Sequence, residues 1–121
     1  MTITQCLHTA ILVTDLAKAE NFYSNILGLS KSEKRSLKFA GSWYQIGAYQ
    51  IHLIVNPEFT NPIFNQDKWG RNPHLALATD NLAEVIAKLQ NHDYPVQMSS
   101  SGRAALFTQD PDGNIIEISQ I

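Results

Sequence analysis

Three histidines and one glutamate occupy matching places in two similar stretches of the 121-residue chain. His8 begins an apolar run that ends in Thr-Asp-Leu, and His74 begins a second run with nearly the same ending, Thr-Asp-Asn-Leu. Farther along each stretch, His52 and Glu117 stand in equivalent apolar runs. A lone strand histidine is more often a hydrogen-bonded core residue, but the paired placement of all four favours a metal site. Three imidazoles and a carboxylate suit zinc, nickel, iron or manganese.

Strand geometry indicates where these side chains point. Alternation along residues 50–55 turns His52 away from its apolar neighbours, and the same rule along 114–119 turns Glu117 away from its two flanking isoleucines. The apolar faces suit packing under helices. We therefore expect the His/Glu faces to point into the concavity between two modules, with Glu117 as a metal ligand, a proton acceptor, or both in turn.

A helix is predicted after each Thr-Asp pair. Apolar residues recur there at three- and four-residue steps, as on one face of a helix. Asp15 and Asp80 are the expected N-caps, Gly28 is expected to end the first helix, and Pro95 follows the end of the second.

Strand-length runs separated by turn residues follow each helix. They cover about residues 29–37, 39–46 and 50–55 in the first half, and 96–99, 104–109 and 114–119 in the second. The turn Asp110-Pro111-Asp112-Gly113 predicts a hairpin before the last run. Each half is thus β-α-β-β-β, which predicts one α+β domain over 1–121, built from modules of about 1–56 and 73–121. The connection 56–72 is long enough either to cross between modules or to cover a site.

Composition narrows the class of protein. Nine Lys+Arg against eleven Asp+Glu give a net charge of −2, so no basic field favours nucleic acid or an anionic membrane. No apolar run is long enough to span a bilayer, and the N-terminus does not read as a signal peptide. Cys6 is the single cysteine and has no partner for an internal disulfide. We expect a cytoplasmic protein that binds neither nucleic acid nor membrane.

The chain resembles the vicinal oxygen chelate superfamily, which includes glyoxalase I, fosfomycin-resistance thiol transferases, extradiol dioxygenases and bleomycin-resistance proteins. The segments that carry the resemblance are residues 8–16, Phe22-Tyr23, Leu27-Gly28-Leu29, residues 74–80, residues 110–114 and Ile116-Glu117. The resemblance implies paired βαβββ modules that form a cupped mixed sheet around a metal, usually in a homodimer.

The resemblance also implies a role for each candidate ligand. By position, His8, His74 and Glu117 match the two-histidine, one-glutamate set of the dioxygenases and fosfomycin enzymes. His52 stands where glyoxalase I has a glutamate, which is a departure from that enzyme. The leading hypothesis is a divalent-metal enzyme in which the ion acts as a Lewis acid on a small oxygen-chelating substrate, in isomerase/lyase chemistry or thiol transfer. The alternatives are an extradiol-type dioxygenase and a non-enzymatic ligand-sequestering protein of bleomycin-resistance type.

Several other side chains could join such a site. Cys6 could approach it from the strand of His8, although a buried and inert thiol is the usual case. Arg103, beside a Ser/Gly-rich loop, could bind an anionic part of a substrate, with surface solvation as the default. The aromatic residues Trp43, Tyr44, Trp69 and Phe107 could line a ligand cleft or belong to the core, and the core is favoured for Trp43 and Tyr44. His92 is expected at the surface.

Overall fold

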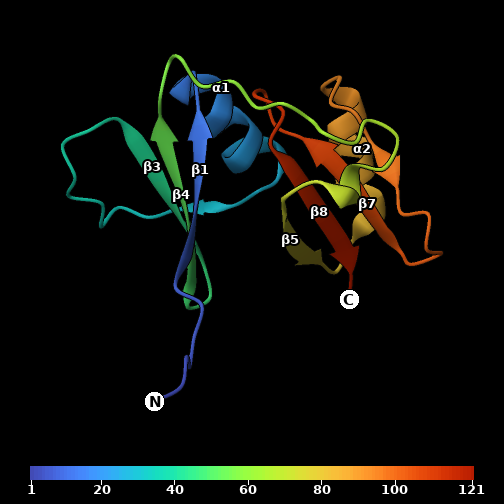
Figure 1. Cartoon of the computed structure of the whole chain (residues 1–121), viewed down its shortest axis with the longest axis horizontal. Helices are drawn as coiled ribbons and strands as arrows, with labels where there is room; N and C mark the ends of the chain where they lie inside the picture. The colour runs from blue at the N-terminus through green and yellow to red at the C-terminus, as the bar shows by residue number, and fades with distance from the viewer. The chain divides into compact units, whose positions relative to one another are not determined.

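The computed structural model describes residues 1–121, which form two compact units, Met1–Phe59 and Thr60–Ile121 (Figure 1). The elements of the first unit are β1 (His8–Val13), α1 (Leu16–Glu20), the π-helical segment η1 (Asn21–Ile26), β2 (Ser30–Lys31), β3 (Gly41–Ile46) and β4 (Tyr49–Val55). The strand order in its sheet is β1-β4-β3-β2, with β1 and β4 parallel and the other pairs antiparallel.

The second unit repeats this topology. Its elements are the 3₁₀ turn η2 (Trp69–Arg71), β5 (His74–Thr79), α2 (Leu82–Asn91), β6 (Gln97–Met98), β7 (Ala105–Gln109) and β8 (Ile115–Gln120). The strand order is β5-β8-β7-β6, again with one parallel pair, β5 and β8. The α+β class and the repeated βαβββ order predicted from the sequence are therefore confirmed. The helices are all too short or too polar to cross a bilayer.

The hydrophobic core of the first unit lies between the sheet and the helical segment. Ile51 and Leu53 of β4 are fully buried, as are Phe22 and Tyr23 of η1. His52, between the two buried β4 residues, is on the opposite face of the strand, as the alternation predicts. Burial of these apolar side chains is the main term that stabilises the unit and fixes the register of β4.

The second unit departs from simple alternation at β8. Ile116 and Ile118 are buried as predicted, and Leu82 and Leu89 of α2 belong to the same core. Glu117 is also buried, with 9% of its surface exposed. A carboxylate at that depth needs polar partners, so its surroundings carry information about the site.

Some predicted boundaries are corrected by the structure. Asp15 caps α1 by accepting from the Lys18 amide, as expected. The cap of α2 is Asn81 rather than Asp80, because the Asn81 side chain accepts from the Glu84 amide at 3.1 Å.

Two further chain segments differ in length or conformation from the prediction. The predicted first helix changes to π-helical geometry after Glu20, and Gly28, with φ +74°, follows it as expected. The predicted strand 29–37 is reduced to Ser30–Lys31, because only these two residues pair with β3.

The connection between the predicted modules is organised by one buried side chain. Asn72, 6% exposed, accepts from the amides of Phe64 and Asn65 and donates to the carbonyls of Asn65 and Trp69. These bonds replace a regular ladder and hold the segment in a closed loop. Residues 60–72 therefore belong to the second unit.

Candidate functional site

His74 and Glu117 lie together on one face of the second sheet. Glu117 is opposite Ala76 in the β5–β8 register, so His74 is its diagonal neighbour on the same face. His74 Nε2 is 3.4 Å from Glu117 Oε1, and the two side chains are 24% and 11% exposed. Two of the four candidate ligands, one from β5 and one from β8, are therefore brought together by the structure.

The hydrogen bond on the other ring nitrogen indicates which tautomer His74 adopts. Nδ1 is 2.7 Å from the Asn72 carbonyl oxygen, which can only accept, so Nδ1 carries the proton. In neutral His74 the Nε2 lone pair then faces a carboxylate oxygen. Two electron-pair donors at this separation are stabilised by a cation between them, and a backbone bond on the second ring nitrogen is typical of metal-binding histidines.

The second carboxylate oxygen of Glu117 has its own partners. Ser119 Oγ donates to Oε2 at 3.2 Å, and Arg103 Nη1 is 3.6 Å from the same oxygen. These contacts compensate for burial of the charge and fix the plane of the carboxylate. Oε1 is thereby turned toward His74.

The other two candidate ligands form a stack in the first unit. His52 lies between His8 and Trp43, with ring centroids 4.1 and 4.3 Å apart and interplanar angles of 10° and 11°. The pKa of His52 is lowered from its ordinary 6.5, first by burial and then by the charges of His8 and Arg35. The neutral imidazole, which is the form that binds metals, is favoured as a result.

A chain of amide side chains determines the tautomer of His52. Gln45 Nε2 donates to the Gly47 carbonyl at 2.7 Å, and Gln50 Nε2 donates to Gln45 Oε1, also at 2.7 Å. Gln50 Oε1 is left to accept from His52 Nε2 at 2.8 Å. Because the Gly47 carbonyl cannot donate, reversing any amide would bring two acceptors together. His52 therefore carries its proton on Nε2 and offers Nδ1.

The stacked rings are not in a chelating arrangement. A metal ion lies in the plane of each imidazole that binds it, and two nearly parallel stacked rings have no common point near their nitrogens. His8 or His52 must therefore turn before both can bind one ion. Within each unit, no group of three or more His, Cys, Asp or Glu side chains is placed to hold a metal. The structure thus forms two donor pairs, one in each unit.

The remaining sequence candidates divide between site and surface. Cys6 is exposed and precedes β1, so the expectation of a buried thiol is wrong. Tyr44 is fully buried, as expected, whereas Trp43 is half-buried and stacks on His52, which corrects the core position favoured for it. His92 is exposed and bonds to the Lys88 carbonyl of its own helix, which agrees with a surface assignment.

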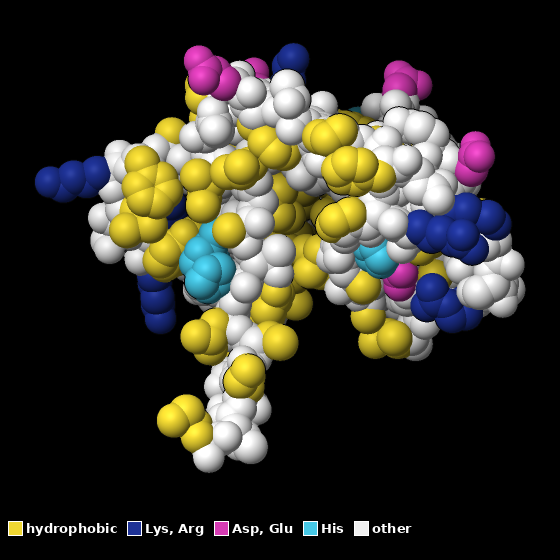
Figure 2. All heavy atoms as spheres, viewed as in Figure 1, with side chains coloured by type: hydrophobic (Ala, Val, Ile, Leu, Met, Phe, Trp, Pro, Cys, Tyr) yellow, Lys and Arg dark blue, Asp and Glu magenta, His cyan; other side chains and the backbone are white.

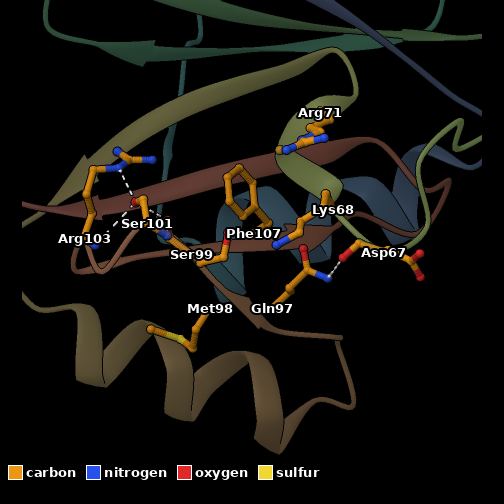
Figure 3. A pocket seen from close by; sticks show the side chains of 11 residues that line it. Asp67, Lys68, Arg71, Gln97, Met98, Ser99, Ser101, Arg103 and Phe107 are labelled. Atoms are coloured by element: carbon orange, nitrogen blue, oxygen red, sulfur yellow. Dashed lines mark hydrogen bonds between the residues drawn. The ribbon is translucent and has the colours of Figure 1, made fainter.

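A pocket of about 260 Å³ lies in the second unit (Figure 3). It is lined by Asp67, Lys68, Gly70, Arg71, Gln97, Met98, Ser99, Ser100, Ser101, Arg103 and Phe107. Phe107 lies edge-on to His74 with ring centroids 5.4 Å apart, and Arg103 reaches Glu117. In Figure 2, an exposed histidine side chain on this unit lies next to acidic and basic side chains.

Two of the cationic lining residues escaped the sequence analysis. Lys68 and Arg71 stand in a connection without periodicity, where nothing marks a single residue as functional. The one available indication was the unusual length of that connection. It had suggested, as one of two alternatives, that the connection covers a site.

Comparison with known proteins gives concordant results. The model of the family "Glyoxalase/Bleomycin resistance protein/Dioxygenase superfamily" matches residues 5–118. The lactoylglutathione lyase of Salmonella typhimurium is 27% identical over 120 residues, covering 93% of this chain and 89% of that protein. The Arabidopsis thaliana protein Glyoxylase I 4 is 30% identical over 125 residues, covering 96% and 70%. In fold, a glyoxalase/dioxygenase from Nostoc punctiforme superposes with a TM-score of 0.77 at 22% identity, covering 94% and 88%.

Proposed function

The chain belongs to the Glyoxalase/Bleomycin resistance protein/Dioxygenase superfamily, and we propose that it is a divalent-metal-dependent enzyme of the lyase or isomerase type. Its substrate is a small molecule that binds the metal through oxygen. The observation that carries this proposal is the His74–Glu117 pair, in which a nitrogen lone pair and a carboxylate oxygen converge at 3.4 Å with no donor proton between them in the neutral state.

The residues present fit a borderline or hard divalent ion. In the second unit His74 and Glu117 would supply one nitrogen and one oxygen, and in the first unit His8 and His52 are two further candidate nitrogen donors. Zinc, nickel, manganese and iron all accept such donors. When bound, the ion supplies Lewis-acid stabilisation of negative charge on a substrate oxygen.

The protein side chains have separate tasks around this centre. Glu117 is the proton acceptor of the proposed reaction, because its Oε1 faces the site while Ser119 and Arg103 hold its Oε2. The Asn72 carbonyl keeps the Nε2 lone pair of His74 directed at Glu117, and the bond to Gln50 leaves the Nδ1 lone pair of His52 available to a metal.

The reaction class is supported by the relatives and by the donor set. Both curated relatives described above carry lyase or glyoxalase names. As a fourth donor beside two histidines and one glutamate, His52 would fill a position that an extradiol-type dioxygenase needs open for its substrates. These observations favour isomerase or lyase chemistry over oxygen insertion.

Metal binding by purified protein tests the proposal. After removal of metals with a chelator, zinc, nickel, manganese and anaerobic iron are titrated by calorimetry, and bound metal is measured by elemental analysis. We expect one ion per chain, and roughly 100-fold weaker binding in His74→Ala and Glu117→Gln, with circular dichroism unchanged. His92→Ala is the matched control, because His92 bonds only to its own helix carbonyl in an exposed position.

Two outcomes would contradict the proposal. Wild-type metal content in His74→Ala would show that His74 is not a metal ligand. Oxygen uptake with a catechol, without turnover of a thiohemiacetal, would indicate the dioxygenase reaction instead. We also propose that the protein is a homodimer, as the resemblance implies, and light scattering on the same samples, with and without metal, tests this.

A further inference from the structure

The pocket of the second unit has an excess of positive charge. Lys68 and Arg71 line it from the connecting segment, and Arg103 lines it from the loop between β6 and β7. Asp67 is the one carboxylate among the lining residues, and Arg103 pairs with the Glu117 carboxylate, so Lys68 and Arg71 are the two lining cations without an ion pair. Figure 3 shows Lys68 and Arg103 on opposite sides of Phe107, with Arg71 above the ring in this view.

The connecting segment that carries Lys68 and Arg71 is fixed in place by specific contacts. Gln97 accepts from the Trp69 amide at 3.0 Å and donates to the Asp67 carbonyl at 3.1 Å. Gly70 lies so close to Phe107 that a Cβ there would be 2.6 Å from the ring atom Cζ. Glycine permits this approach without a shift of the ring, and the contact holds the segment that carries Lys68 and Arg71 against Phe107 of β7.

The opposite wall is a loop of hydroxyl groups that orients Arg103. Arg103 Nε donates to Ser101 Oγ at 3.1 Å, and the hydroxyls of Ser99 and Ser101 are 2.8 Å apart. The same guanidinium contacts Glu117 through Nη1. Arg103 therefore borders both the pocket and the proposed catalytic carboxylate, so a ligand in the pocket would extend toward the His74–Glu117 pair.

We propose that this pocket binds a dianionic oxyanion, the phosphate group of a phosphate monoester substrate, and so places the rest of that substrate at His74 and Glu117. A dianion matches the two cations without an ion pair, Lys68 and Arg71, whereas a single carboxylate would leave one of them uncompensated. A tetrahedral phosphate also presents three oxygens, which suits cations on two walls and the serine hydroxyls beside them. The substrate assignment rests on the proposed function, whereas phosphate binding by the pocket does not.

Inorganic phosphate is the probe for the pocket. Phosphate is titrated into chelator-treated, metal-free protein at constant ionic strength. Binding is followed by NMR through the amide signals of residues 99–103. We expect saturable binding that is weakened about 10-fold or more in Arg71→Ala and in Lys68→Ala. Lys88→Ala is the matched control, because Lys88 is an exposed cation on α2 that pairs with Glu84, and it should bind phosphate as the wild type does.

Acetate and succinate are titrated in the same way, and their binding is compared with that of phosphate. Phosphate binding at least 10-fold tighter than that of either carboxylate supports the proposal. Equal or tighter binding of acetate or succinate would overturn the phosphate assignment, and no saturable phosphate binding, or equal weakening by Lys88→Ala, would overturn the pocket itself. Failure here leaves metal binding by His74 intact, and loss of metal binding leaves phosphate binding intact, so the two proposals fail separately.

Discussion

Replacement of Gly70 by alanine tests whether the connecting segment is held by close contact with Phe107. The added Cβ would lie 2.6, 3.0 and 3.2 Å from Cζ, Cε1 and Cε2 of the ring, whereas ordinary contact begins at 3.4 Å. The nearest pair must therefore separate by about 0.8 Å, the difference between 3.4 and 2.6 Å. Because Phe107 is only 8% exposed, the ring has little room to withdraw.

The expected magnitude follows from two opposing terms. Overpacking of a buried contact costs about 1–3 kcal/mol. Gly70 does not have a positive φ, so alanine can adopt its backbone conformation. Alanine also restricts the unfolded chain, which raises the free energy of unfolding by about 0.4–1 kcal/mol. We expect a net loss of about 0.5–2 kcal/mol in the free energy of unfolding, measured by urea denaturation, with a melting temperature lower by several degrees.

A double-mutant cycle with Phe107→Leu isolates the contact. Leucine lacks the Cε and Cζ atoms, so in that background Gly70→Ala should be neutral or stabilising by up to about 1 kcal/mol. The sign of the Gly70→Ala effect thus reverses between the two backgrounds. An equal loss of stability in both would refute the reasoning, because the cost would then arise from the backbone of the segment and not from the ring.

Three further predictions concern other parts of the structure. Asn81→Ala removes the cap of α2 and should cost about 1 kcal/mol in chemical denaturation, whereas Asp80→Ala should cost much less. Burial would raise the pKa of Glu20, but hydrogen bonds from Lys31 and Ser42 outweigh it and lower the pKa below 4.5. Glu20 therefore stabilises the fold at neutral pH, and the advantage of wild type over Glu20→Gln should disappear as the pH falls through the lowered pKa, as urea titrations at several pH values would show. Asp110→Ala removes a buried acceptor of two backbone amides at 2.9 Å and should lower the free energy of unfolding by about 2–4 kcal/mol, measured by thermal denaturation.

Much of the fold could be predicted from local pattern. Alternation placed His52 opposite the buried face of β4, and the Thr-Asp pairs marked where the helices begin. The repeat singled out His74 and Glu117 as candidate ligands, and the β5–β8 register places them on one sheet face. These features are determined by periods of two and of 3.6 residues, which a single sequence displays directly.

The chemistry of the site was decided by contacts between residues distant in sequence or without a pattern. The stack of His52 on Trp43 depends on the cross-strand register, and the Nδ1 bond of His74 depends on the path of the chain just before β5. Lys68 and Arg71 reach the pocket because Gly70 packs on Phe107. Sequence periodicity determines which face a side chain occupies, whereas its rotamer, tautomer and neighbours are selected by close packing in the folded state.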